Sequence, residues 1–147
     1  MKRLIGTVCL VLLSVATYSA KATSGRELGA KLVSRAVELV GDSGAYIHDI
    51  PLSPRRDEPG LARHLAKRMV WFRDYARQKR GKNDPVIVIS DDPALGARVA
   101  HAAFSSLRAG SLRGLRVICI VGKRYDAYLH DAADATAVNL QVEPLPK

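Results

Sequence analysis

The sequence lacks the motifs by which several large enzyme classes are recognised. It has no P-loop, because Gly122-Lys123 has neither the upstream glycines nor the following Ser or Thr of that motif. It has no Gly-x-Ser-x-Gly nucleophile turn, since Ser90 is followed by two acids and a proline. The four histidines are scattered, and none pairs with another His or Cys at metal-ligand spacing. We therefore expect no metal site and no cofactor, and catalytic activity stays an open alternative.

Cysteine is scarce, with two in the chain. Cys9 lies in an N-terminal apolar run, so Cys119 is the single cysteine that follows that run. A single thiol cannot form an internal disulfide, which leaves a free thiol or a link to another chain. Cys119 lies in the middle of the apolar stretch 117–121, which predicts a small buried side chain without a redox role.

Apolar runs long enough to span a membrane are also missing. The longest covers 4–16, which is shorter than the roughly 20 residues that a spanning helix needs. Lys2 and Arg3 precede this run, and Ala20-Lys21-Ala22 follows it, which is the pattern of a cleavable secretory signal. We predict a signal peptide at 1–22, one domain at 23–147 and a periplasmic or secreted location. The alternative is an uncleaved N-terminal anchor.

Acidic residues are few, with 14 against 23 Lys and Arg, for a net charge of +9. The segment 61–82 alone holds eight basic residues and one acid. Such a patch steers acidic proteins, nucleic acids or anionic lipid surfaces, and we expect an acidic envelope protein as partner. Trp71 and Tyr75 widen the apolar stripe of this segment, so we expect them to pack inward. The candidate partner-binding residues are Arg63, Lys67, Arg73, Arg77 and Arg80.

Hydrophobic periodicity predicts alternating strands and helices. Prolines at 51, 54 and 59 indicate a loop before the second helix, and Asp92-Pro93 is typical of a helix start. Strands that are apolar on both faces favour a parallel sheet covered on both sides. The predicted fold is a small three-layer α/β sandwich with four mainly parallel strands and an extra N-terminal helix. We expect helices at 26–40, 61–80, 93–109 and 123–134, and strands at 45–50, 85–90, 115–121 and 137–142.

The carboxyl ends of the predicted strands carry polar residues. In open parallel sheets, ligands usually bind at this edge. A rim with acids, bases and a histidine could hold a small ligand or an anion, although Asp92 is also the natural cap of the following helix. The ligand-binding candidates are His48, Asp49, Asp91, Asp92, Lys123 and Arg124.

The segment 86–144 resembles the C-terminal part of small exported proteins encoded on integrative conjugative elements. The shared features are a hydrophobic strand running into Asp91-Asp92-Pro93, a helix, a strand that begins at Gly114-Leu115, and a last strand ending in Val142-Glu143-Pro144. The resemblance covers less than half of the chain. It implies an accessory role in conjugative transfer at the cell envelope, and it carries over no catalytic residues.

Two functions follow from these observations. The first is a non-enzymatic exported interaction protein, which belongs to a conjugation or secretion apparatus and binds through 61–82. The alternative is a small periplasmic enzyme or ligand-binding domain with its site at the strand ends.

Overall fold

A computed structural model describes residues 27–41, 44–50, 57–78 and 84–147. A helix over 27–40 comes first among the described residues, and four strands and three further helices follow it. The strands are β1 (Tyr46–Ile50), β2 (Val86–Ser90), β3 (Arg116–Ile120) and β4 (Asn139–Glu143); the helices are α2 (Glu58–Gln78), α3 (Pro93–Ser105) and α4 (Asp126–Ala133). Short 3₁₀ turns flank α4 at Lys123–Tyr125 and Asp134–Thr136.

The four strands form one parallel sheet in the order β1-β2-β3-β4. Each of the helices α2, α3 and α4 therefore connects one strand to its immediate neighbour, and all three lie on the same face of the sheet. The strands β2 and β3 are central and almost wholly buried, as expected for β-branched runs covered on both faces.

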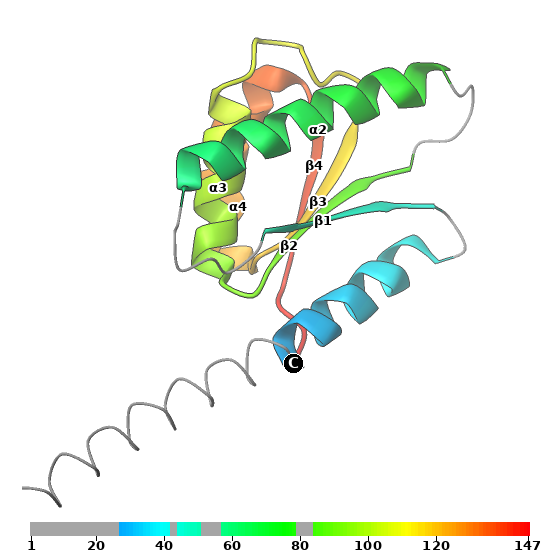
Figure 1. Ribbon diagram of the computed structural model, residues 1–147, viewed down its shortest axis with the longest axis vertical. Coiled ribbons are helices and arrows are strands. Elements are labelled where there is room, and N and C mark those ends of the chain that lie inside the picture. Colours follow the sequence, from blue (N-terminus) through cyan, green and yellow to red (C-terminus); the bar gives the residue numbers. More distant parts are fainter. Residues whose placement is uncertain (1–26, 42–43, 51–56, 79–83) are drawn as a thin grey trace, which may run out of the picture.

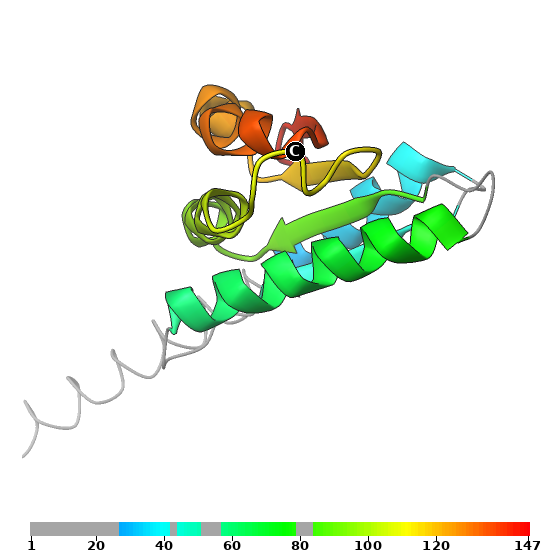
Figure 2. The same cartoon turned by 90° about the horizontal axis from the view of Figure 1, so that it is seen from above.

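Helices cover both faces of the sheet (Figures 1 and 2), which confirms the predicted three-layer sandwich. On one face, which we call the α2 face, α2 packs beside α3 and α3 packs beside α4. The core of this face includes Leu65, Met69, Phe104 and Val117. On the other face, the N-terminal helix places Leu32 and Ala36 against the isoleucines of β2 and β3. Cys119 is fully buried in the α2-face core, as predicted, and burial raises its pKa to about 12.

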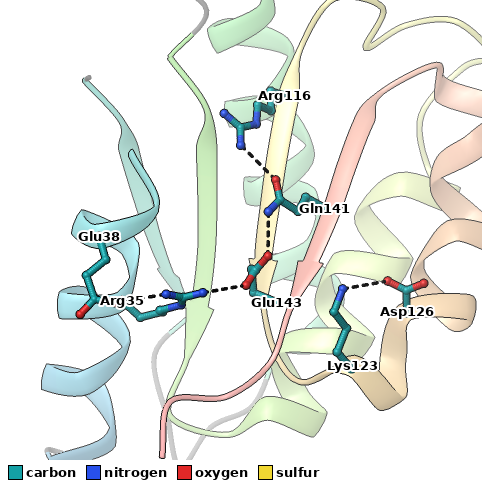
Figure 3. A network of polar contacts seen from close by, with 7 residues as sticks. All are labelled: Arg35, Glu38, Arg116, Lys123, Asp126, Gln141 and Glu143. Atoms are coloured by element: carbon teal, nitrogen blue, oxygen red, sulfur yellow. Dashed lines mark hydrogen bonds and ion pairs between the residues drawn. The ribbon is translucent and has the colours of Figure 1, made fainter. Parts of the chain in front are cut away.

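A chain of polar contacts joins the N-terminal helix to the edge strand β4 (Figure 3). Arg35 donates to Glu38 and to Glu143, both at 3.2 Å. Glu143 also accepts from Gln141 at 2.7 Å, and Gln141 accepts from Arg116 at 3.0 Å. The hydrogen bond from Gln141, followed by that from Arg35, lowers the pKa of the Glu143 carboxyl. The apolar layer under this helix is thus bordered by a polar seam.

Several element boundaries differ from the predicted ones, and three of these differences have a local cause. Helix α2 begins three residues earlier, because Pro59 lies in its first turn, where a missing N–H costs no helical bond, and Asp57 accepts from the Gly60 amide at 3.0 Å. Helix α3 ends at Ser105 instead of 109, since the next hydroxyl, Ser106 Oγ, donates to the Ala103 carbonyl. Strand β4 starts two residues later because 137 is left-handed, with φ 59°, and closes a turn.

The predicted signal peptide lies outside the described residues, as does part of the loop at 51–60. In the part of the chain that is described, no helix combines the length and the apolar character needed to cross a membrane.

Candidate functional site

The outer flank of α2 carries a stripe of polar and aromatic side chains. His64, Arg68, Trp71 and Tyr75 follow one another at spacings of four, three and four residues. This spacing aligns them along one side of the helix. The stripe lies beside the edge strand β1, since the His64 ring is 5.5 Å from that of His48. We call these four residues the α2 stripe.

Trp71 was predicted to pack inward, but the structure places it at the surface. Its side chain is 53% exposed, and its ring stacks on Tyr75 at 5.3 Å with an angle of 11° between the planes. Phe72 packs edge-on against Trp71 at 4.7 Å and lies 4.2 Å from Tyr46 of β1. The partly buried rings of Tyr46 and Phe72 therefore support an aromatic pair of which Trp71 faces the solvent.

The predicted basic candidates fall into two groups. Arg63, Lys67 and Arg77 are exposed and make no ion pair with any residue in the described ranges, and the same holds for Arg68. Arg73 is different, because its side chain is 18% exposed, bonds Asp74 at 2.7 Å and donates to the Ser111 carbonyl. Arg73 thus ties α2 to the loop before β3. The remaining candidate, Arg80, lies outside the described residues.

The candidates at the end of β1 point to opposite faces of the sheet. His48 is buried on the α2 face, and burial, with the nearby charges of His64 and Arg68, lowers its pKa to about 4. Asp49 is exposed on the opposite face of the sheet, where partial desolvation and then the charge of Asp91 raise its pKa. The structure therefore separates His48 from Asp49 and brings Asp49 near Asp91.

The turn after β2 is held by structural hydrogen bonds. Asp92 Oδ1 accepts from the amides of Ala94 and Leu95, both at 3.1 Å, which confirms its capping role. Ser90 Oγ donates to the Ile50 carbonyl and accepts from the Asp92 amide, each at 3.2 Å. These bonds connect the ends of β1 and β2 to the start of α3.

The basic candidates after β3 also have partners. Lys123 Nζ lies 4.0 Å from the Asp126 carboxylate (Figure 3), and the Arg124 guanidinium lies 4.8 Å from the Tyr125 ring centre. In the described ranges, no group of three His, Cys, Asp or Glu side chains could hold a metal ion. The strand order also never reverses, so this sheet has no switch point of the kind that opens a ligand crevice.

The capping role of Asp92 gives a direct prediction. Asp92→Ala should lower the free energy of unfolding by about 1 kcal/mol, because two amides at the start of α3 lose their acceptor. Asp92→Asn should keep most of the stability, since an amide oxygen also caps. Urea unfolding measures both; an equal loss in the two variants would contradict a role limited to capping.

Comparisons of the chain with protein families, curated proteins and solved structures found no match. The geometry of the described residues is therefore what bears on the function. Sequence reasoning found the basic character of α2 but missed the α2 stripe, although the spacing of its members was visible.

Proposed function

We propose that this protein is a non-enzymatic interaction protein that binds an acidic protein through the outer surface of α2. The observation that carries the proposal is the exposed Trp71, stacked on Tyr75 and flanked along the helix by Lys67 and Arg68. Trp, Tyr and Arg are the residues that contribute most binding energy at protein interfaces. A solvent-exposed tryptophan held by its neighbours binds at little entropic cost.

The side chains on the outer surface of α2 favour a protein partner over a nucleic acid or a lipid surface. The basic side chains of α2 supply long-range attraction to an acidic surface. Nucleic-acid binding by stacking would call for aromatic side chains that bases can reach in succession, whereas Tyr75 already stacks against Trp71. The paired rings and exposed arginines together suit a compact acidic protein surface.

We propose that the partner is an envelope protein, a component of a conjugation or secretion apparatus. The leader-like N-terminus and the resemblance of 86–144 support this location. The alternative, a ligand site at the strand ends, is less well supported, because the structure divides its residues between two faces and uses Asp92 and Lys123 in local contacts.

In vivo cross-linking tests the proposed surface. A photoreactive amino acid replaces Trp71 in one strain and Tyr128 in another; Tyr128 is an exposed aromatic on α4, 41% accessible. We expect one acidic protein to be cross-linked from position 71 and not from 128. Adducts that are sensitive to nuclease, or adducts with lipid alone, would contradict a protein partner.

Charge variants measure the contribution of the basic residues. The double variant Lys67→Glu/Arg68→Glu should weaken binding of the purified partner by tenfold or more. Lys31→Glu/Lys147→Glu changes the net charge by the same amount at exposed positions on the N-terminal helix and the C-terminal tail, away from α2, and should have less than a twofold effect. Equal losses in the two variants would show a nonspecific charge effect and would contradict the proposed surface.

A further inference from the structure

A hollow of about 210 Å³ opens at the C-terminal end of α2, next to the α2 stripe. The rings of Tyr46, Phe72 and Tyr75 line it. The rings of Phe72 and Tyr75 meet at 79°, so they form two nearly perpendicular walls. Since Tyr75 also stacks on Trp71, the hollow continues the aromatic surface proposed to bind the partner.

Small residues leave this space open. Gly44, Ala45 and Ala76 complete the apolar part of the lining. A Cβ atom at Gly44 would lie 2.9 Å from Asp84 Oδ2, so the Asp84 carboxylate lies close against this glycine. The walls are therefore mostly aromatic or aliphatic.

Asp84 is the one charged residue among the described residues that line the hollow. An ionised carboxylate accepts hydrogen bonds and donates none. The hollow therefore suits a flat apolar group that carries a single donor. The basic side chains of α2 nearby, such as Arg77, disfavour a free cation at this place, whereas they do not repel a neutral donor.

We infer that this hollow binds a tryptophan or tyrosine side chain of the partner, with the indole N–H or phenol O–H donating to Asp84. The inference rests on the proposed function, because it supplies the anchor pocket of that interface. Both side chains combine a large apolar ring with one polar donor. Residues of this kind fill pockets at interface centres and pair with aromatic residues opposite them.

A titration without the partner tests the hollow. N-acetyltryptophanamide is added to the purified protein, in the form that the cell produces, while amide signals are followed by NMR. We expect saturable shifts at Gly44, Ala45 and Ala76. The analogue methylated at the indole nitrogen lacks the donor and should bind about tenfold more weakly, because the Asp84 carboxylate would lose a charge-assisted hydrogen bond.

Two variants separate the donor contact from the apolar fit. Asp84→Ala should bind the two analogues equally, and Ala76→Leu should bind neither, because its side chain fills the hollow. A native-like amide spectrum establishes that each variant folds. Absence of saturable shifts, equal binding of the two analogues by the wild-type protein, or tighter binding of tetramethylammonium would overturn the inference. The titration contains no partner. If the α2 charge variants bound the purified partner as well as the wild-type protein does, the proposed function would be refuted, but the binding of N-acetyltryptophanamide in the hollow would stand.

Discussion

Between pH 7 and pH 4 the wild-type protein is expected to lose about 3 kcal/mol of stability through His48, and His48→Leu is expected not to show this loss. The value follows from a His48 pKa lowered to about 4 from an ordinary 6.5, at about 1.4 kcal/mol per pKa unit. His48 is 7% exposed on the α2 face, so its protonation in the folded state requires a charge in a poorly solvated place. Leucine at this position has no titratable group, so it binds no proton in the folded or the unfolded state.

The direction follows from the protons bound in each state. Between pH 6.5 and pH 4 the unfolded chain protonates His48 and the folded chain does not, so acid favours unfolding. The charged groups that face His48 are His64 and Arg68, and both oppose its protonation. Asp49 acts in the opposite direction: its raised pKa means that the folded state keeps a proton longer as the pH rises, which makes Asp49 stabilising only at low pH.

Urea unfolding at a series of pH values measures the effect. The wild-type curve should fall more steeply than that of His48→Leu from pH 6.5 downward. His64→Gln should give an intermediate slope, because it removes one of the charges that lower the His48 pKa. His101→Gln, which changes a histidine elsewhere in the fold, serves as the control. Parallel curves for the wild-type protein and His48→Leu would show that His48 is protonated equally in the two states.

The element pattern was predictable because local chemistry determines it. The apolar runs of β2 and β3 are buried on both faces, and Asp92 caps α3 as its position before Pro93 predicts. The predicted boundaries were wrong where a residue suits two kinds of local structure. Pro59 was taken as a loop residue, but proline is equally suited to the first turn of a helix.

The exposure of Trp71 was not predictable from the helical pattern alone. A helix of 21 residues is about 31 Å long, whereas a five-residue strand extends about 17 Å. Helix α2 is therefore longer than β1, and Trp71 lies on its flank beside Phe72, whose ring contacts Tyr46 of β1. The strand order, which comes from contacts between distant segments, was likewise open in the sequence.

The strand-end site could have been questioned from the sequence. Adjacent residues of a strand point to opposite faces, so His48 and Asp49 could not both contribute to one cluster on a single face. The structure places His48 under α2 and Asp49 beside Asp91. Identification of the α2 stripe, in contrast, required knowing which side of α2 meets β1.

Gly96→Ala is expected to lower the free energy of unfolding by about 2 kcal/mol, although alanine is the better helix former. A Cβ atom at Gly96 would lie 2.9 Å from Ser90 Cβ and 3.1 Å from Val121 Cγ1. Neither neighbour can move easily, since Ser90 is held by two hydrogen bonds and Val121 is fully buried. Helix α3 must therefore shift away from the sheet.

The control is Ala102→Gly, at an exposed position of the same helix, where only helix propensity changes and the loss should be about 1 kcal/mol. Adding Val121→Ala to Gly96→Ala should cost less than the two separate losses together, because it removes one of the two close contacts. A stabilised Gly96→Ala would show that α3 is not pressed against the strand ends. The close approach at Gly96 shows that the first turns of α3 pack directly against Ser90 at the end of β2 and Val121 just after β3.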